Sequence, residues 1–466
     1  MHIKIPRITI SALRGGSGKT IVSIGLISSL KDRGYEVSAF KKGPDFIDSC
    51  WLKIAAKREC YNLDPFLMNS SQLLDSFLTH SMGSDIAIIE GNRGIYDGMD
   101  LNGSCSTAEL AKLIRSPVVL ILDVTMSTRT NAALVLGCER FDPAIKLKGV
   151  ILNRLGGLRQ ERVIKESIKR YCDVEVVGAI PRYHNNPFPQ RHMGLVPFHE
   201  SGFAMEAIEW AKEMVERYVD IKRILEISRD AHPLEISITK ISDRVSFRNL
   251  KVGFIKDRAF WFYYPENLEQ LRQIGADLVE IDSVKSKELP HIDALYIGGG
   301  FPELHLEYLS ENIKFRRSIR DRIEAGLPVY AECGGFMYLG NYIIVKERKF
   351  PMVGAFPISF FMESRPQGHG YTVLEVIKEN PYFAIGSQIK GHEFHYSRPQ
   401  IAGSVDLVFN VKRGKGIYRG MDGAVKKNTL ATYSHIHCGG EKRWAESFLA
   451  LAHRYRKNLI KMQKWD

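Results

Sequence analysis

The stretch Arg14-Gly15-Gly16-Ser17-Gly18-Lys19-Thr20 decides the fold of the first half of the chain. It follows a short apolar run at residues 7–12 and opens a segment in which Ile21, Ile24 and Ile27 recur at roughly helical spacing. A glycine-rich loop between a strand and a helix offers backbone N–H groups and a helix N-terminus to a phosphate. We therefore predict that ATP binds through Gly15, Gly16, Ser17, Gly18, Lys19 and Thr20.

Two side chains of this loop are expected to act on the nucleotide. Lys19 can reach the terminal phosphates, and Thr20 can hold Mg²⁺. The strict eight-residue pattern has a glycine where this chain has Leu13. The loop resembles instead the deviant phosphate loop of dethiobiotin-synthetase-like and MinD-like ATPases, in which some members have lysine at the position of Arg14. Related ATPases have an asparagine that recognises the nucleotide base at the position of Asn153. The alternative is that Asn153 is an ordinary turn residue.

Acidic residues follow the next predicted strands, as a nucleotide-bound Mg²⁺ requires, because this ion takes oxygen ligands. Asp45 comes shortly after the strand predicted at 36–40, and Glu90 ends the run 85–89. We predict that the metal ligands are Thr20, Asp45 and Glu90.

Other polar residues of the same segments have less specific patterns. Asp48 and Asp97 are candidates for binding substrate, and each could equally be a turn residue. Lys41 and Lys42 fit either an anionic substrate or a solvated surface.

Alternating strands and helices give the fold class. Apolar runs at 7–12, 36–40, 85–89, 117–122, 148–152 and 175–180 read as strands with amphipathic segments between them. This alternation predicts an α/β fold with a mostly parallel sheet covered by helices. Residues 203–245 become charged and helical and end in a polar stretch near 240–249, which fits a linker. We predict two domains, an ATP-binding domain over 1–245 and a second α/β domain over 246–466.

In the second half of the chain the alternation of predicted strands and helices begins again, with glycines at different places in the pattern. Strands are expected at 251–256, 277–281, 293–297 and 328–331, with helices beginning near Pro265, Glu311 and Gly334.

Composition sets the class of partner and compartment. The 466 residues hold 65 Lys+Arg against 53 Asp+Glu, a net charge of +12 that favours anionic partners. The basic residues are scattered, which disfavours nucleic acid. No apolar run approaches the roughly 20 residues that span a bilayer. Seven cysteines form no CxxC pair, so we expect a cytoplasmic protein without a disulfide framework or a thiolate zinc site and without a membrane anchor.

The stretch Val329-Tyr330-Ala331-Glu332-Cys333-Gly334-Gly335 carries the second chemistry. A cysteine at a sharp turn from strand to helix is typical of a nucleophile elbow, in which the helix N-terminus is expected to lower the thiol pKa. Gly334 would supply an oxyanion N–H. The base must be a distant histidine, and His435 and His437 lie on one face of a strand about a hundred residues later. A Cys/His pair of this kind performs acyl chemistry, here most plausibly on an amide.

Two further groups surround this motif. The loop Gly298-Gly299-Gly300 ends a predicted strand, and we expect Gly299 or Gly300 to donate the second oxyanion N–H. His392 and His395 resemble metal ligands in their spacing. Because no other Cys or His residues cluster with them in the sequence, we interpret them as polar residues of a pocket.

Eight ordered blocks across nearly the whole chain resemble the cobyrinic acid a,c-diamide synthase family, which includes the Ni-sirohydrochlorin a,c-diamide synthases of coenzyme F430 biosynthesis. The blocks are GGSGKT (15–20), KKGPDFID (41–48), EGNRGIYDG (90–98), FYYPENLE (262–269), LYIGGGFPELH (295–305), VYAECGGFMYLG (329–340), GHEFHYS (391–397) and SHIH (434–437). The resemblance implies a P-loop domain of the dethiobiotin-synthetase type followed by a class I glutamine amidotransferase-like domain.

This resemblance implies a division of labour between the halves. Glutamine would be hydrolysed by Cys333 as nucleophile and His435 as base, and the ammonia would pass to the first domain. There ATP would phosphorylate the a and c acetate carboxylates, with Asp48 and Asp97 orienting substrate or metal. Related amidotransferases of this class lack an acidic third member, so Glu332 is given no such role.

The resemblance leaves several points open. An anionic tetrapyrrole suits the positive charge, and the aromatic residues Phe260, Trp261, Tyr263 and Tyr264 either pack on its ring or belong to the core. The ring itself is either a corrin or Ni-sirohydrochlorin. A MinD-like ATPase switch with a degenerate second domain is a more remote alternative. We expect only small-molecule partners, with a homodimer left open.

Overall fold

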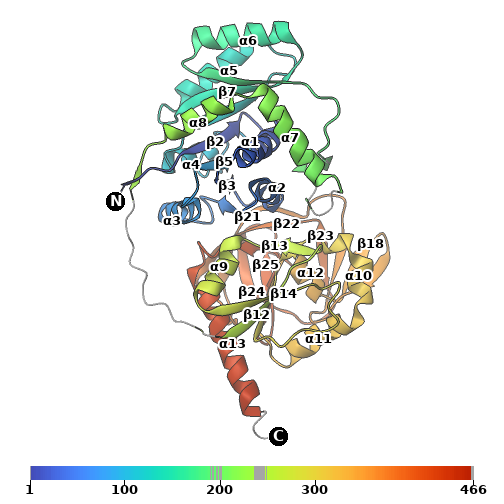
Figure 1. Ribbon diagram of the computed structural model, residues 1–466. Helices are drawn as coiled ribbons and strands as arrows, with labels where there is room; N and C mark the ends of the chain where they lie inside the picture. Colours follow the sequence, from blue (N-terminus) through green and yellow to red (C-terminus); the bar gives the residue numbers. More distant parts are fainter. Residues whose placement is uncertain are drawn as a thin grey trace. The chain divides into compact units, whose positions relative to one another are not determined.

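The computed structural model describes residues 2–188, 190, 191, 194, 195, 198, 202–235, 247 and 249–462. The chain divides into two compact units, residues 1–240 and 241–466, and each is described by itself (Figure 1). Most of the linker predicted at 240–249, together with the boundary predicted at 245/246, lies outside the described residues.

The described part of the first unit is built on a seven-stranded parallel sheet. Its strands, in order across the sheet, are β4 (Cys60–Leu63), β3 (Val37–Lys42), β5 (Ile86–Glu90), β2 (Arg7–Ala12), β6 (Val118–Asp123), β7 (Leu147–Leu155) and β8 (Glu175–Pro181). Six of these seven confirm the strands predicted from the apolar runs, and β4 was not predicted. Four short strands pair apart from this sheet, β1 (His2–Ile3) with β11 (Leu234–Glu235) and β9 (Gln190–Arg191) with β10 (Gly194–Leu195).

Helices cover both faces because the strands are apolar on both sides. In β5, Ile86 and Ile88 join one core cluster, while Ala87 and Ile89 join another, as the side-chain alternation of a strand requires. The first face is packed by α1 (Lys19–Asp32), α2 (Phe46–Ala56), α7 (Ala204–Tyr218) and α8 (Ile221–Arg229). The second is packed by α3 (Ser70–Ser81), α4 (Thr107–Leu113), α5 (Thr130–Phe141) and α6 (Leu158–Tyr171).

The second unit has a ten-stranded mixed sheet within the residues that are described. Its order is β14 (Ala276–Ile281), β12 (Leu250–Ile255), β15 (Ala294–Ile297), β17 (Val329–Glu332), β26 (Thr429–Thr432), β25 (Met421–Lys426), β24 (Asp406–Arg413), β21 (Gly368–Val376), β22 (Gln388–His395) and β27 (His435–Ile436). The strands up to β26 are parallel, and the rest pair antiparallel. Because two residues separate β26 from β27, the antiparallel half must curl back toward the parallel half.

Smaller sheets and helices complete this unit. Two side sheets are formed by β13 (Phe260–Phe262) with β16 (Gly299–Gly300), and by β19 (Arg348–Pro351), β18 (Tyr342–Val345), β20 (Ile358–Met362) and β23 (Ser397–Ile401). The helical segments are α9 (Pro265–Gln273), η2 (Pro302–Leu304), α10 (Leu306–Glu311), α11 (Ile313–Glu324), α12 (Gly334–Leu339) and α13 (Lys442–Met462).

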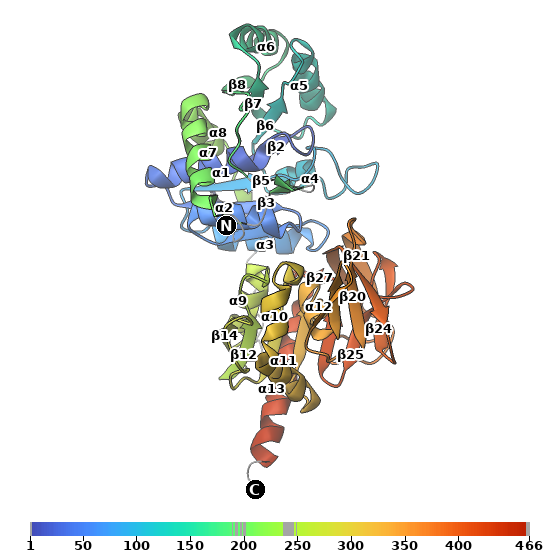
Figure 2. The same cartoon turned by 90° about the vertical axis from the view of Figure 1, so that its right-hand side faces the viewer.

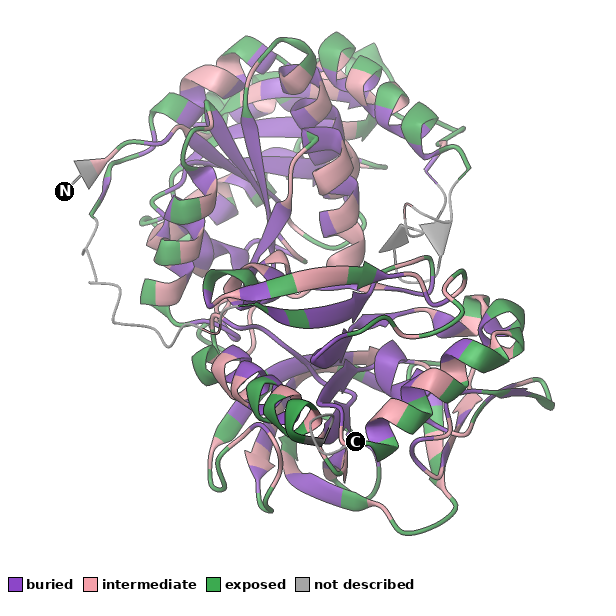
Figure 3. Cartoon of the chain, turned by 60° about the horizontal axis from the view of Figure 1, so that its bottom comes forward, coloured by how far each residue is buried: buried purple, intermediate pink, exposed green. Residues whose placement is uncertain are grey.

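Core residues alternate between the two faces of the parallel half. In β17, Val329 and Ala331 pack with α11 and α12, whereas Tyr330 packs with α9 and α13. Figure 2 shows the strand and helix layers of this unit edge-on, and Figure 3 shows buried strands inside helices whose outer faces are exposed. None of the helices in the described ranges is long and apolar enough to cross a bilayer.

Candidate functional site

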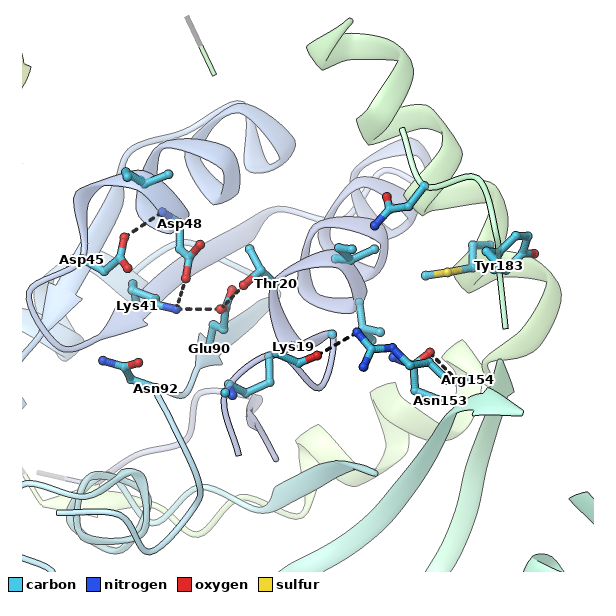
Figure 4. A pocket seen from close by; sticks show the side chains of 18 of the residues that line it. Lys19, Thr20, Lys41, Asp45, Asp48, Glu90, Asn92, Asn153, Arg154 and Tyr183 are labelled. Atoms are coloured by element: carbon cyan, nitrogen blue, oxygen red, sulfur yellow. Dashed lines mark hydrogen bonds and ion pairs between the residues drawn. The ribbon is translucent and has the colours of Figure 1, made fainter. Parts of the chain in front are cut away.

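The glycine-rich loop joins β2 to α1, as predicted, at the carboxyl edge of the first sheet. Gly16 and Gly18 have φ of 72° and 100°, a left-handed conformation that glycine adopts without strain. The loop lines one side of a cavity of about 610 Å³, whose other walls come from β3, β5 and α7 (Figure 4). Five of the six predicted loop residues, all but the buried Ser17, therefore line a space that suits an anionic ligand.

Side chains from the neighbouring strands brace this loop. The Asn153 amide donates to the Ser17 carbonyl at 2.8 Å, and Arg154 donates to the Gly16 carbonyl at 2.9 Å. Asp123 holds Arg154 at 2.8 Å in turn. The observed contact of Asn153 is thus with the loop backbone, and recognition of the base by this residue stays a prediction.

Lys19 lies within the loop with its ammonium group turned to backbone oxygens. It donates to the carbonyls of Arg14, at 3.2 Å, and Arg93, at 2.8 Å. Burial, with the nearby Lys41 charge, lowers the pKa of Lys19 to about 8. If a phosphate bound in the loop, the Lys19 ammonium could donate to its charged oxygens instead of to these two neutral carbonyls.

An acid cluster lies beside the loop, where β3 and β5 end in register. Thr20 donates to Glu90 at 2.8 Å, and Lys41 contacts Glu90 at 2.7 Å and Asp48 at 2.6 Å. The Lys41 side chain is 2 % exposed. The solvated reading of Lys41 is therefore wrong, because its ammonium is buried between two carboxylates. Lys41 lines the cavity, and its binding of an anionic substrate stays a prediction.

Asp45 lies in the same cluster and begins α2. Its carboxylate accepts from the Asp48 N–H at 2.9 Å and so caps the helix. Burial, followed by repulsion from Asp48, raises the pKa of Asp45 to about 7. Burial also raises the pKa of Glu90. A cation beside these groups would relieve both costs.

Asp97 is held differently from the other predicted acids. Its carboxylate accepts from the Gly94 N–H at 2.8 Å and closes the turn after β5, which matches the turn reading. It is absent from the described lining of the cavity. The cavity also has lining residues that were not singled out from the sequence, namely Asn92, Arg93, Pro181, Tyr183, Asn186, Trp210 and Met214.

Replacing Asp45 by asparagine is expected to stabilise the magnesium-free protein more at about pH 8 than at about pH 5. The folded carboxyl keeps its proton up to about pH 7, whereas the ordinary pKa is 3.8, so stability falls as pH rises between these values. Asparagine removes that titration and still caps α2. Melting temperatures measured in a chelator at both pH values check this, and an equal gain at both would contradict it.

The second unit places Cys333 at a strained turn between β17 and α12. Its φ of 48° lies in a region that is costly for a residue with a Cβ. The thiol donates to the Phe394 carbonyl at 3.5 Å. Burial raises the pKa of Cys333, with a smaller opposing effect from the Gly334 N–H. The lowered thiol pKa expected from the sequence is therefore wrong for this state, because desolvation outweighs the short helix.

The loop after β15 packs between this elbow and His435, which lies in β27. A Cβ built on Gly299 would lie 2.4 Å from Cε1 of His435, and one built on Gly334 would lie 3.0 Å from the Gly300 nitrogen. The loop thus contacts the base on one side and the residue after the nucleophile on the other. Glycine is required at both positions because a side chain would overlap these groups.

The two candidate bases have different surroundings. His435 Nδ1 lies 3.3 Å from Glu332, whereas His437 Nε2 lies 3.5 Å from Glu266. The Gly439 N–H donates to Nδ1 of His437 at 3.0 Å. The ring of His435 packs directly against Gly299 beside the elbow, so the geometry favours His435 as the base.

Comparisons with known proteins agree with both halves of this picture. Residues 8–195 match the CobQ/CobB/MinD/ParA nucleotide binding domain, and residues 251–443 match the CobB/CobQ-like glutamine amidotransferase domain. The chain is 42% identical to a cobyrinate a,c-diamide synthase of Magnetococcus marinus, covering 98% of this chain and 99% of that protein. The chain belongs to the cobyrinate a,c-diamide synthase family. The family and the fold class predicted from the sequence are confirmed.

Further relatives extend the same match. A cobyrinate a,c-diamide synthase of Archaeoglobus fulgidus is 42% identical over 97% of this chain and 98% of its own. Another, from Listeria innocua, is 37% identical over 92% and 96%. This cobyrinate a,c-diamide synthase family member is therefore similar to its relatives along both domains.

Other predicted residues in the second unit fall in the core. Phe260, Tyr263 and Tyr264 are buried, and the Tyr263 hydroxyl donates to the Ile255 carbonyl at 2.5 Å. The core reading is thus right for these three, while Trp261 is half-buried. In the described part of the chain no group of three or more His, Cys, Asp and Glu residues is arranged to hold a metal ion. His392 and His395 contact Tyr264 and Tyr433, respectively.

Gly299→Ala is expected to lower glutamine-dependent activity about 10- to 100-fold, because the new Cβ displaces the His435 ring from its position near the elbow. Activity with free ammonia should be unchanged. Gly403→Ala is the matched control, since its Cβ would meet only Pro357 at 3.5 Å. Steady-state rates with each nitrogen donor check this, and a wild-type rate of Gly299→Ala with glutamine would refute the proposed crowding.

Proposed function

We propose that this chain catalyses ATP- and glutamine-dependent amidation of the a and c acetate side chains of cobyrinic acid. One observation carries this proposal. A phosphate loop with an acid cluster and a Cys/His elbow occur in one chain that matches cobyrinate a,c-diamide synthases over nearly its full length. The site in the second unit suits glutamine hydrolysis, and the site in the first unit suits ATP-dependent activation of a carboxylate.

In the second unit, glutamine would be hydrolysed through a thioester. The Cys333 sulfur attacks the amide carbon while His435 takes the thiol proton and passes it to the departing ammonia. Water then cleaves the thioester, which releases glutamate and restores the thiol. The N–H groups of Gly334 and of the Gly299–Gly300 loop would stabilise the oxyanion. Because burial raises the pKa of the Cys333 thiol, the proton transfer to His435 would accompany the attack.

In the first unit, ATP would activate the substrate carboxylate. The carboxylate oxygen attacks the terminal phosphorus and forms an acyl phosphate with release of ADP. Ammonia then attacks the acyl carbon, and phosphate leaves. Phosphorylation is needed because an oxide is a poor leaving group. Lys19 would stabilise the negative charge on the transferred phosphoryl group.

The acid cluster fits Mg²⁺, although its occupancy is a proposal. Within the described residues, the Oε2 atom of Glu90 is buried without a hydrogen-bond partner, and the carboxylates of Asp45 and Glu90 are chemically suited to this ion. We propose that Thr20, Asp45 and Glu90 hold it. Bound there, Mg²⁺ would supply charge neutralisation for the phosphates.

Asp48 and Asp97 would act around this centre. Asp48 pairs with Lys41, so it sets the charge of the cluster and would orient the substrate or the metal. Asp97 shapes the turn that follows Glu90. We also propose a cytoplasmic enzyme, since none of the seven cysteines forms a disulfide bond, which suits a reducing compartment.

Mass spectrometry of the tetrapyrrole product tests the proposal. The purified protein is incubated with ATP, Mg²⁺ and glutamine, and cobyrinic acid and Ni-sirohydrochlorin are offered in parallel. Two successive replacements of OH by NH₂ on cobyrinic acid are expected. The same change on Ni-sirohydrochlorin alone would reassign the ring. If ATP is hydrolysed and neither ring changes, the amidation proposal fails and an ATPase switch becomes the better reading.

A further inference from the structure

A buried carboxylate directly precedes the nucleophile and contacts the base. The Oε2 atom of Glu332 lies 3.3 Å from Nδ1 of His435, and its Oε1 accepts from the Ile436 N–H at 3.1 Å. Tyr296 donates its hydroxyl to the same Oε2 at 3.1 Å. Glu332 and His435 are each 1 % exposed. Water therefore screens this contact very little, and charge at either group acts strongly on the other.

The fold explains why these distant residues meet. Glu332 is the last residue of β17, and in register it faces Thr432 of the parallel neighbour β26. The chain continues from Thr432 to His435 within three residues, which returns the histidine to the end of β17. Cys333 follows directly and has a φ of 48°, which is not the backbone conformation of a strand. The side chains of Glu332 and Cys333 therefore need not point to opposite faces of the sheet, as neighbouring residues of one strand do.

The histidine segment is held on both sides of its backbone. Asn267 donates to the Ile436 carbonyl at 2.9 Å and accepts from the Cys438 N–H at 2.8 Å, while Glu332 accepts from the Ile436 N–H. The ring of His392 stacks on that of His435 with centroids 4.9 Å apart. The imidazole therefore has a defined plane as well as a defined backbone.

We propose that Glu332 is the positioning residue of the glutaminase site. Its carboxylate accepts the Nδ1–H of His435, which selects the tautomer whose Nε2 carries no proton and can therefore accept the thiol proton. Nε2 lies on the side of the Gly299 loop, 3.1 Å from a Cβ built on Gly299. This inference rests on the proposed function, because it assigns a role within glutamine hydrolysis.

The proton balance is simple. When Cys333 attacks, its proton moves to Nε2 of His435, and the ring becomes positively charged while Nδ1–H stays bound to ionised Glu332. The same proton then leaves on ammonia. Glu332 exchanges no proton and touches no substrate atom, so it acts through His435 alone.

Glu332→Gln tests this role, because it keeps the shape and an oxygen for the Ile436 N–H but loses the charge. We expect kcat with glutamine to fall about 10²- to 10⁴-fold, while KM for glutamine changes less than about threefold and the rate with ammonia is unchanged. Glu266→Gln is the matched control, since Glu266 contacts the other histidine. Its kcat should stay close to the wild-type value.

The remaining outcomes are decisive as well. A wild-type kcat for Glu332→Gln, or an equal fall in Glu266→Gln, overturns the proposal. If Glu332→Gln does not fold, Glu332→Asp replaces it; an intermediate kcat with an unchanged KM supports the role, and a wild-type kcat contradicts it. If the wild-type protein hydrolyses no glutamine, the proposed function fails and the assignment falls with it. The two failures are thus distinguishable.

Discussion

Cys333→Ala is expected to lower glutamine-dependent amidation by at least about 10³-fold, since no other group can form the thioester. The rate with saturating ammonia should remain within about twofold of the wild type, because free ammonia bypasses thioester formation. The substituted residue lies in the second unit, and the phosphate loop and acid cluster lie in the first. Product formation with each nitrogen donor, measured by mass spectrometry, checks both expectations.

Cys438→Ala provides the control for that experiment. Its thiol is as buried as that of Cys333, at 6 % against 3 % exposure, and the contact of residue 438 with Asn267 runs through the backbone N–H. Both donors should therefore serve this variant normally. Retention of glutamine-dependent amidation by Cys333→Ala would refute the assigned nucleophile.

Lys19→Met is expected to lower amidation by at least about 10²-fold with either nitrogen donor, because the ammonium would stabilise the phosphoryl group in transfer. Glutamine hydrolysis in the second unit should be retained, although ammonia would then be released unused. Acyl phosphate formation is followed as ADP release, and glutaminase activity as glutamate release. Equal losses in both assays would contradict a role confined to the ATP-dependent step.

Lys31→Met controls for the loss of a positive charge from α1. Lys31 lies near the end of the same helix and pairs with Glu36 at 3.0 Å, remote in sequence from the loop. Both half-reactions should continue at the wild-type rate. Together, Cys333→Ala and Lys19→Met separate the nitrogen-supplying step from the carboxylate-activating step, since only the first is rescued by ammonia.

Much of the parallel framework could be predicted because its signals are local. Strands such as β5 and β6 are nearly continuous apolar runs, as expected where both faces of a sheet are covered. The glycine loop and the elbow are likewise read from adjacent residues. The strands from β18 to β25, which form the four-stranded side sheet and most of the antiparallel half of the second unit, were not predicted. These strands have mixed patterns of buried and exposed residues, for example in β21 and β23. They lack the continuous apolar runs by which the parallel strands were predicted.

The chemistry of single groups was harder to predict than their identity. The sequence indicated Cys333 as a nucleophile but implied the wrong direction for its pKa, because a motif carries no measure of desolvation. It likewise left Lys41 either solvated or available to substrate, whereas the ammonium is buried between Glu90 and Asp48. Burial depends on what the rest of the chain packs around a group.

Sequence alone was sufficient for the family, the fold class and the presence of two units, and it indicated the residues proposed for both sites, since each rests on patterns of adjacent residues. Only the tertiary structure decided which of these groups meet. Lys41 reaches Glu90 across 49 positions and His435 reaches Glu332 across 103. Such pairs depend on strand register, and a shift of one residue would turn the side chain to the other face of the sheet.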